Sequence, residues 1–499
     1  MGKSYHFSFL GVSILWRLQQ QVRNRLLCVD QNRRCVYSLR RGIYYMVITC
    51  FDDVVRFMES FPNLEKQTTH YTTRTYRLDR MHSLLAYLGN PELSFKKIHL
   101  AGSKGKGSTA SYLASALTAL GYKTGLYLSP HLVDYRERFS LSGTFFSDDL
   151  LVQTGKELQI LVQGFHFTDQ WGETNPTTFE LYTAYAYMLF KNSACDWAVI
   201  ETGLGGRLDA TNTITAEACV LCPIELEHTK ILGDTIEKIA AEKSKIIKNG
   251  VPTFIGFEEE AAMSVFLAEA KAMHSPTYLL SESIKELSSK TTTEGELVRY
   301  QWKDGTEEHL LLSMRGSVQA QNSALALLVL RTLGLYNEKV IPAIEKNQIP
   351  GRFQQLSTSP CLYVDGAHTT HSLKALLSSF SSLHHEGTNT IIYGALEDKD
   401  HHHMANLVLD HFQQIIISRP GTYKKSDIAS LYALFCDLAR KRSQTYQILL
   451  VEDNTQALKA AYSMTSNSSA IMVCGSFYLA GGVKAAFEQI RSTYESQLA

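Results

Sequence analysis

The sequence predicts an α/β protein in which an N-terminal domain with a mostly parallel sheet is followed by a smaller C-terminal α/β domain. From Lys97 onward, short apolar runs alternate with segments of helical periodicity, the pattern of βαβ units. A glycine-rich turn, residues 102–108, separates the first such run from the first such helix. The length of 499 residues favours more than one domain, and Pro350 and Gly351 interrupt the alternation.

The expected strands are short and apolar, and amphipathic helices lie between them. In the first domain we expect strands at 98–101, 124–128, 197–201, 218–224 and 251–255, and helices at 52–60, 180–190 and 235–248. In the second domain we expect strands near 362–364, 390–394, 414–418 and 470–474. Residues 275–310, rich in Ser, Thr, Lys and Glu, look like an insertion or an exposed hairpin.

Composition excludes several classes of protein. The 49 Lys and Arg residues match the 49 Asp and Glu residues, so no net charge attracts nucleic acid or an anionic membrane. No apolar run reaches the ~18 residues of a membrane-spanning helix. The nine cysteines are scattered without a disulfide framework, which favours the reducing cytoplasm. The CxxC pair Cys219 and Cys222 lies in an expected strand, which favours a core role over zinc or redox chemistry.

Three segments follow from this pattern: a basic extension over 1–45, a central domain over 46–345 and a C-terminal domain over 346–499. The extension is rich in arginine and contains one acidic residue, Asp30. Its composition resembles a transit peptide. The alternative, which we favour, is that Met46 is the true start, because a helix is expected just after it, and that the extension is poorly ordered.

The glycine-rich turn has the composition of a phosphate-binding loop. Between a strand and a helix, backbone N–H groups and the helix dipole favour an anion. Its glycines allow close approach of the backbone, Lys106 can reach phosphates as a point charge, and Ser108 offers a hydroxyl to Mg²⁺. The spacing departs from GxxxxGK[ST], because Gly107 separates Lys106 from Ser108. The residues of this loop are Gly102, Ser103, Lys104, Gly105, Lys106, Gly107 and Ser108.

The loop AGSKGKGS, followed by LSPHL at 128–132, resembles a ligase family that includes folylpolyglutamate synthase and the muramyl-peptide ligases. The folylpolyglutamate synthase and dihydrofolate synthase branch is more similar, and the resemblance spans about residues 50–490. The motifs that carry it are TFE at 178–180, ETGLGGRLDATN at 201–212, EH at 227–228, ILGD at 231–234, EKSKIIK at 242–248, PGRFQ at 350–354, DGAH at 365–368, DKD at 398–400 and GSFYL at 475–479.

This resemblance implies a P-loop mononucleotide-binding domain, a C-terminal α/β domain and an active site in the cleft between them. It implies ATP-dependent addition of L-glutamate to dihydropteroate, to the glutamate tail of tetrahydrofolates, or to both, through an acyl phosphate. ADP and phosphate are released. The wording RLDATN is typical of the bacterial bifunctional enzymes. We therefore expect a cytoplasmic monomer that uses ATP and two Mg²⁺ ions, with no nucleic-acid or membrane partner.

The resemblance also implies roles for individual residues. Glu201 is a metal-ligand candidate on independent grounds, because it ends a predicted strand, where ligands collect in open α/β sheets. Lys243 matches a lysine that carries a carbamate in the family, whereas its helical pattern alone indicates an exposed lysine. The remaining expectations are Lys106, His228, Lys243 and Arg352 for catalysis; Asn322, Arg352, Asp365 and His368, with the loop, for ATP; Ser108, Ser129, Glu201 and His228 for magnesium; and Phe179, Glu180, Asp209, Lys399, Asp400 and Tyr478 for the substrates.

Some residues differ from those usual at the motif positions of the family, so the substrate range and the reaction rate stay open. Glu227 stands where aspartate is typical, Thr369 and Thr370 replace Asn-Pro, and Lys104 adds a charge to the phosphate loop. Two other functions stay possible from the residues: a Mur-type ligase with another carboxylate acceptor, and a nucleotide-binding regulator without ligase activity. The three consecutive histidines at 401–403 are expected to be solvated.

Overall fold

The computed structural model describes residues 37–40, 43–63, 77–168, 174–421 and 425–498. The prediction that residues 1–45 form a poorly ordered extension falls mostly outside these ranges. Within them, β1 (Tyr37–Arg40) and β2 (Ile43–Met46) form an antiparallel hairpin. Among the residues that the structure describes, no helix combines the length and apolar character required to cross a membrane.

The first sheet contains seven strands in the order β5-β4-β6-β3-β7-β8-β9 and is parallel except at β5. Its central strand β3 precedes the glycine-rich loop, and its neighbours are β6 and β7. The carboxyl ends of these three strands therefore meet at one edge of the sheet. The bounds are β3 Lys96–Ala101, β4 Thr124–Tyr127, β5 Phe139–Leu141, β6 Trp197–Glu201, β7 Ala218–Leu221, β8 Thr253–Ile255 and β9 Thr277–Leu279.

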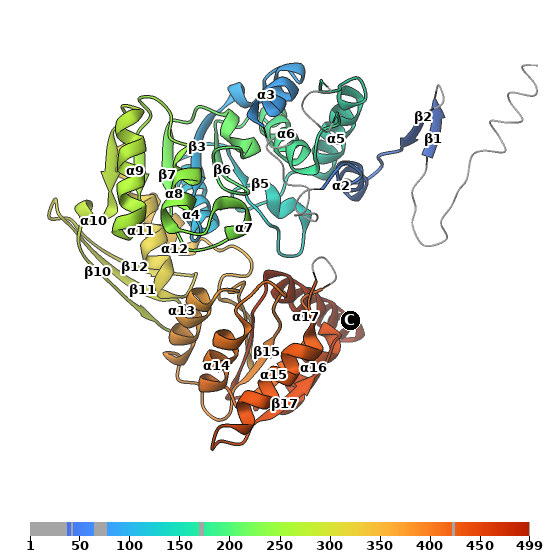
Figure 1. Ribbon diagram of the computed structural model, residues 1–499, viewed down its shortest axis with the longest axis vertical. Coiled ribbons are helices and arrows are strands. Elements are labelled where there is room, and N and C mark those ends of the chain that lie inside the picture. Colours follow the sequence, from blue (N-terminus) through green and yellow to red (C-terminus); the bar gives the residue numbers. More distant parts are fainter. Residues whose placement is uncertain (1–36, 41–42, 64–76, 169–173, 422–424, 499) are drawn as a thin grey trace, which may run out of the picture.

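Helices cover both faces of this sheet (Figure 1). The helix α4 begins within the glycine-rich segment, at Lys106. The bounds are α2 Phe51–Glu59, α3 Leu78–Tyr87, α4 Lys106–Ala119, α5 Asp148–Val162, α6 Thr178–Asn192, α7 Thr229–Leu232, α8 Ile236–Ser244, α9 Glu260–Ala272, α10 Leu280–Ser283, α11 Ser317–Thr332 and α12 Val340–Lys346. The prediction of alternating strands and helices is confirmed here.

The second sheet contains six strands in the order β13-β14-β18-β15-β16-β17 and forms a separate lobe with its helices (Figure 1). It is parallel except where β13 pairs with β14. The strands are β13 Gln354–Thr358, β14 Cys361–Val364, β15 Thr390–Tyr393, β16 Gln414–Ile417, β17 Gln447–Leu450 and β18 Ala470–Cys474. The helices are α13 Thr370–Ser381, α14 His401–His411, α15 Ile428–Arg440, α16 Asn454–Met464 and α17 Phe477–Leu498.

Residues 275–310 do not form an exposed hairpin. They contribute to a three-stranded antiparallel sheet of β10 (Ile284–Thr291), β11 (Glu296–Trp302) and β12 (Glu307–Leu312). Val298, Tyr300 and Trp302 alternate along β11 on one face and are buried in the cluster that includes α11. The alternation of apolar residues, hidden by the polar composition, gives this sheet a packed face.

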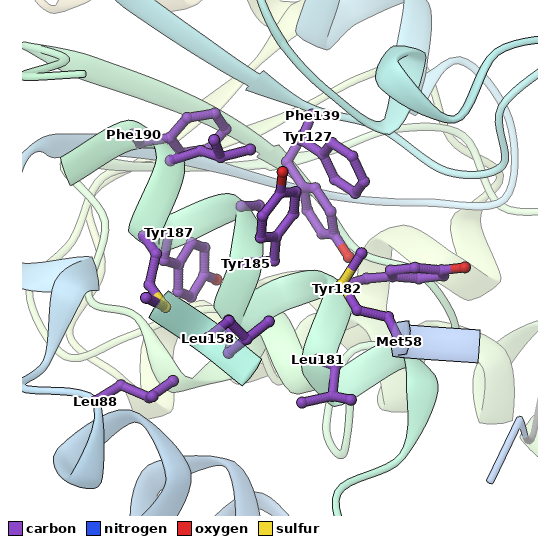
Figure 2. Packing of buried hydrophobic residues seen from close by; sticks show 14 of the residues in the cluster. Met58, Leu88, Tyr127, Phe139, Leu158, Leu181, Tyr182, Tyr185, Tyr187 and Phe190 are labelled. Atoms are coloured by element: carbon purple, nitrogen blue, oxygen red, sulfur yellow. The ribbon is translucent and has the colours of Figure 1, made fainter. Parts of the chain in front are cut away.

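An aromatic core fixes α6 against the first sheet. Tyr182, Tyr185 and Tyr187 are buried, and Figure 2 shows them beside Phe139 and Phe190. The Tyr185 hydroxyl donates to the carbonyl oxygen of Leu151 at 2.8 Å. Since helical stability comes mostly from tertiary packing, this core holds α6, and with it the TFE motif at its first turn, in a fixed place.

The two cysteines of the CxxC pair are both buried and free, which agrees with the predicted core role. Cys219 lies on β7, where its thiol donates to the carbonyl oxygen of Ile246 at 3.0 Å. Burial raises the pKa of each thiol to about 12. Neither thiolate is therefore available at neutral pH for metal binding or redox exchange.

Candidate active site

The glycine-rich loop joins β3 to α4, and Lys106 is the first residue of that helix. Gly105 has φ of +81°, and a Cβ built on it would lie 2.3 Å from Oδ1 of Asn322. No side chain fits there. The Lys106 ammonium donates to the carbonyl oxygen of Gly102 at 2.9 Å, which folds the side chain back over the loop. The arrangement is that of an anion site at a helix N-terminus.

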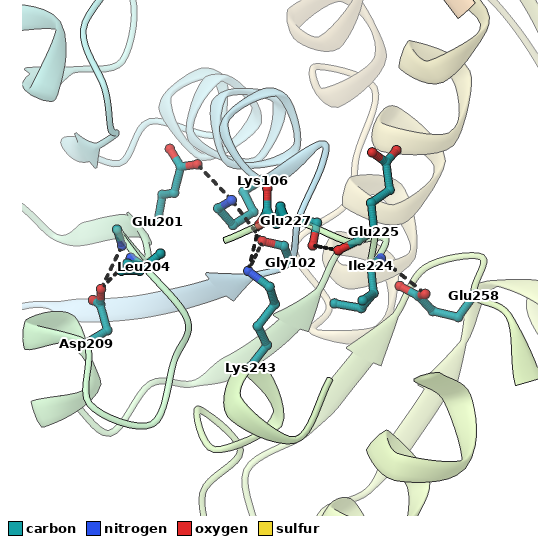
Figure 3. Close-up of polar contacts among 12 residues, drawn as sticks. Gly102, Lys106, Glu201, Leu204, Asp209, Ile224, Glu225, Glu227, Lys243 and Glu258 are labelled. Atoms are coloured by element: carbon teal, nitrogen blue, oxygen red, sulfur yellow. Dashed lines mark hydrogen bonds and ion pairs between the residues drawn. The ribbon is translucent and has the colours of Figure 1, made fainter. Parts of the chain in front are cut away.

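The segment after β7, residues 222–228, is hydrogen-bonded to this loop. The backbone N–H groups of Ser103 and Lys104 both donate to the carbonyl oxygen of Pro223, at 2.8 and 3.1 Å. The Ser103 hydroxyl donates to the carbonyl oxygen of Glu225 at 3.1 Å. This segment is held in turn by Glu258, whose Oε2 accepts the Ile224 N–H at 3.2 Å (Figure 3). Hydrogen bonds therefore connect the segment between β8 and α9 to the phosphate loop.

We expect Glu258→Gln to stabilise the protein at pH 8 and to have little effect at pH 5. Burial raises the pKa of Glu258 from 4.5 to about 8. Between these values the unfolded chain has lost the proton and the folded protein retains it, so wild-type stability falls as pH rises. Glutamine has no such proton to lose, and we expect a gain on the order of 2 kcal/mol at pH 8. Urea unfolding at the two pH values measures it.

The matched control is Glu260→Gln, because Glu260 is an exposed glutamate close in the chain. It should give the same pH dependence of unfolding as the wild type. A Glu258→Gln variant whose stability relative to the wild type does not change between pH 5 and pH 8 would contradict the expectation.

Glu201 ends β6 and faces the phosphate loop. Its Oε1 lies 3.8 Å from the Lys106 ammonium (Figure 3). Its Oε2 accepts the Ser129 N–H at 3.1 Å. The carboxylate is buried, which raises its pKa, although the charge of Lys106 opposes that shift. A buried carboxylate beside a phosphate loop suits a cation-dependent reaction.

Lys243 is buried on α8, unlike the exposed lysine that its helical pattern alone predicts. Its ammonium donates to the carbonyl oxygen of Gly102 at 2.8 Å and pairs with Oε1 of Glu227 at 3.1 Å. Burial lowers the pKa of Lys243 to about 8, although Glu227 opposes the shift. The protonated form still dominates at pH 7, but the neutral, nucleophilic amine is far more abundant than for an exposed lysine.

The side chains proposed for magnesium do not form a cluster rich in carboxylates. Across the described ranges, no group of three or more His, Cys, Asp or Glu side chains could hold a metal ion. Glu201 and Ser129 lie together, Ser108 is buried on α4, and His228 is exposed at the start of α7. The available donors are hydroxyls, a carboxylate and an imidazole, so waters would complete the coordination of a magnesium ion.

On the second lobe, Arg352, Asp365 and His368 lie near one another. Both oxygens of Asp365 accept backbone N–H groups at 2.7 Å, from Phe353 and Ala367, which fixes the turn. A Cβ built on Gly366 would lie 3.1 Å from Nη1 of Arg352. The His368 Nδ1–H donates to the carbonyl oxygen of Gly366 at 2.8 Å. Burial lowers the pKa of His368 to about 3, so its imidazole is neutral and Nε2 can accept a hydrogen bond.

The two lobes meet at this site. Nε2 of His371 on α13 lies 3.9 Å from Oε1 of Glu225 on the segment after β7. Burial raises the pKa of Glu201, and the positive charge of Arg352 from the other lobe opposes this rise. Burial also lowers the pKa of Lys104, which faces Glu225 and Glu227. Positive side chains from both lobes therefore surround the space before the phosphate loop.

The acceptor candidates lie next to this centre. The Phe179 ring packs on Gly203, where a built Cβ would lie 2.2 Å from Phe179 Cζ. Glu180 instead directs both carboxylate oxygens to the buried Arg80. Asp209 accepts the N–H groups of Gly203 and Leu204 at 3.0 and 2.8 Å. The protein itself uses both carboxylates, so we now propose that they shape the site, and that Phe179 faces the acceptor.

The remaining substrate candidates lie on the second lobe. Asp400 is the N-cap of α14, where its Oδ1 accepts the His403 N–H at 3.3 Å. Lys399 pairs with Asp398 at 3.3 Å, and Tyr478 is half-buried at the start of α17. His402 and His403 are exposed, as expected for this histidine run, whereas His401 is half-buried.

Sequence reasoning missed two residues that the structure places here. Gln319 accepts a hydrogen bond from the Asn322 amide at 3.1 Å and belongs to the same turn of α11. Arg80 lies on the inner face of α3 with Met81, Leu84 and Leu85. An arginine within the apolar stripe of a helix was a visible signal, because such a side chain requires a buried partner.

Comparison with known proteins gives the family. The Mur ligase middle domain matches residues 100–330, and the Mur ligase, glutamate ligase domain matches residues 351–477. The dihydrofolate synthase/folylpolyglutamate synthase of Escherichia coli is 31% identical over 440 residues, which cover 85% of this chain and 94% of that protein. The chain belongs to the dihydrofolate synthase/folylpolyglutamate synthase family. The Bacillus subtilis member is 29% identical over 82% of this chain and 94% of its own length.

Solved structures of this family have the same fold. Mycobacterium tuberculosis folylpolyglutamate synthase complexed with ADP and AMPPCP matches with a TM-score of 0.77 at 26% identity, covering 88% of this chain and 98% of that one. The E. coli FolC structure in complex with DHPP and ADP matches with a TM-score of 0.73 at 27% identity, covering 89% and 99%. The family resemblance and the fold class predicted from the sequence are confirmed.

Proposed function

We propose that this protein is an ATP-dependent ligase that adds L-glutamate to dihydropteroate, to the glutamate tail of tetrahydrofolates, or to both. The observation that carries this is the buried contact of Glu201 with the Lys106 ammonium on the phosphate loop, facing the lobe that contains Arg352. The E. coli relative in complex with DHPP and ADP supports both a nucleotide and a pterin-type acceptor. We also propose that the protein is a monomer located in the reducing cytoplasm.

The reaction activates a carboxylate that is otherwise a poor electrophile. An oxygen of the acceptor carboxylate attacks the γ-phosphorus of ATP, which forms an acyl phosphate and ADP. The amine of glutamate then attacks the acyl carbon, loses a proton and expels inorganic phosphate. Lys106 from one lobe and Arg352 from the other stabilise the negative charge that develops on the transferred phosphoryl group. No covalent enzyme intermediate is needed.

Two magnesium ions belong to the proposal, because the donors present fit this ion. The set consists mainly of oxygen donors, and Glu201 is buried beside the loop that would hold the phosphates. Ser108, Ser129, Glu201 and His228 would hold the ions. When bound, they would neutralise phosphate charge and orient the γ-phosphate.

Lys243 is the proposed site of a carbamate. In carbamate formation a neutral amine attacks carbon dioxide and releases a proton, and burial lowers the pKa of Lys243 to about 8. The ammonium lies 2.8 Å from the carbonyl oxygen of Gly102, at the start of the phosphate loop. The modification would replace a buried positive charge with a carboxylate-like group next to the metal ligands.

The nucleotide and the substrates would lie between the lobes. Asn322, Asp365 and His368 would face the base, ribose and phosphates of ATP, with Arg352 at the phosphates. On the acceptor side, Phe179 offers a half-buried ring for a pterin. Lys399, Asp400 and Tyr478 would border the incoming glutamate. Closure of the lobes would exclude water and bring the reacting groups together.

The test is phosphate release from ATP in the presence of dihydropteroate and L-glutamate, compared with mixtures that lack either substrate. We expect release only in the complete mixture, together with a product heavier by one glutamate residue in mass spectrometry. Tetrahydrofolate in place of dihydropteroate tests the second activity. Release that depends on neither substrate would favour a nucleotide-binding regulator. Release with a muramyl-type acceptor alone would favour a Mur-type ligase.

A further inference from the structure

Arg80 carries a buried charge behind the residues proposed to bind the acceptor. It lies on α3 and its side chain has 0% exposure. Burying a guanidinium is costly unless hydrogen bonds and an opposite charge compensate it. Removing one partner from such a pair costs far more than breaking a surface ion pair. The place of this arginine in the fold therefore requires an explanation.

The partners of Arg80 converge on the start of α6. Its Nε and Nη2 donate to Oε1 and Oε2 of Glu180, each at 3.1 Å, in a bidentate pair. Nη2 also donates to the carbonyl oxygen of Asn175 at 2.9 Å. The guanidinium carbon lies 4.0 Å from the ring centroid of Phe167, a cation–π distance. This geometry fits arginine and not lysine.

Glu180 is part of the N-terminal capping box of α6. Its Oε2 accepts the Thr177 N–H at 2.8 Å, while the Thr177 hydroxyl accepts the Glu180 N–H at 3.3 Å. Arg80 therefore fixes a carboxylate that already caps the helix. The first turn of α6 is held at both its backbone and its side chains.

That first turn carries Phe179, the ring proposed to face the acceptor. The ring packs on Gly203, whose N–H donates to Oδ2 of Asp209 at 3.0 Å. Gly203 lies two residues after Glu201, at the end of β6. The helix α3 also packs against the 3₁₀ turn Ala210–Thr213 of the RLDATN motif. Arg80 and its helix thus support both acceptor motifs from behind.

We propose that Arg80 is a positioning residue for the acceptor: through Glu180 it fixes the Phe179 ring against Gly203 and so sets the affinity for the flat heteroaromatic end of the acceptor. This inference rests on the proposed function. The phosphate loop is held by separate hydrogen bonds to the segment after β7. Arg80 therefore acts on acceptor binding and not on nucleotide binding. Small displacements of positioning groups are enough to weaken binding and catalysis.

The test compares KM values in Arg80→Lys and Glu180→Gln. Lysine keeps the charge but loses the bidentate geometry, and glutamine keeps the shape but loses the charge. We expect KM for dihydropteroate to rise about tenfold in each variant, with KM for ATP within about twofold of the wild type. The KM of the double variant for dihydropteroate should not exceed that of the more affected single variant, because the two residues act as one unit. Thermal unfolding and the fraction of active enzyme are measured alongside.

Arg77→Lys is the control, because Arg77 precedes the same helix and pairs with Asp79 on the surface. It should change neither KM. A lower melting temperature with unchanged KM values would make Arg80 a purely structural residue and overturn the inference, as would equal increases in both KM values. If the wild type releases no phosphate with glutamate and either dihydropteroate or tetrahydrofolate, the proposed function fails and this inference fails with it. If the wild type accepts only tetrahydrofolate, the KM values are compared for that acceptor.

Discussion

Lys106→Ala is expected to reduce kcat/KM by about a thousandfold or more, because the variant loses the cation that is held between the phosphate loop and Glu201. In the wild type, the ammonium is held at 2.9 Å from the carbonyl oxygen of Gly102 and 3.8 Å from Glu201. It is therefore preorganised for the charge that develops on the transferred phosphoryl group. Alanine also leaves Glu201 without its nearest positive charge.

Steady-state phosphate release and calorimetric titration with ADP separate the two contributions of Lys106. We expect weaker ADP binding and a larger loss in turnover, since the charge is greatest in the transition state. The control is Lys96→Ala, because Lys96 is exposed at the opposite end of β3. That variant should keep activity within about twofold of the wild type. A Lys106→Ala enzyme within tenfold of wild-type activity would argue against the phosphate-loop assignment.

Glu201→Gln is expected to lower kcat by about a hundredfold or more while leaving thermal stability unchanged or higher. The substitution preserves shape and removes a charge that burial disfavours, as the raised pKa of this carboxyl shows. Glutamine can still accept the Ser129 N–H, which is 3.1 Å from Oε2 in the wild type. It is a poor ligand for magnesium, so catalysis and stability should separate.

The decisive measurement is activity as a function of magnesium concentration, with melting curves on the same samples. We expect the Glu201→Gln variant to need more magnesium for half-maximal activity than the wild type. Glu237→Gln, an exposed substitution on α8, is the control and should match the wild type in both measurements. Full activity with an unchanged magnesium requirement in the Glu201 variant would exclude a role for this carboxylate in metal binding.

The phosphate loop and the end of β6 could be located from the sequence because local patterns determine them. The spacing of Gly102, Gly105 and Gly107 between an apolar run and a helical run indicates a strand, a turn and a helix, and the structure has that order. Glu201 follows an uninterrupted apolar strand, so its place at the carboxyl edge of the sheet was visible as well.

Contacts between distant segments decided the rest. The helical pattern around Lys243 describes a surface helix, yet the fold buries this side chain under Gly102, 141 residues away. Glu180 and Asp209 are candidates for the acceptor site from the sequence. In the structure both carboxylates accept hydrogen bonds from the protein, the first from Arg80, which lies 100 residues earlier. A carboxylate in a sequence does not reveal whether water, a ligand or a distant arginine will neutralise it.

The sequence by itself determined the order of strands and helices, the phosphate loop and the family to which the chain belongs. Each of these depends on the spacing of nearby residues or on short motifs. Only the tertiary structure decided which polar groups are buried and with what they pair. It buried Lys243, joined Arg80 to Glu180 and packed the third sheet on α11. The physical reason is that burial changes the energy of a charge far more than its neighbours along the chain do.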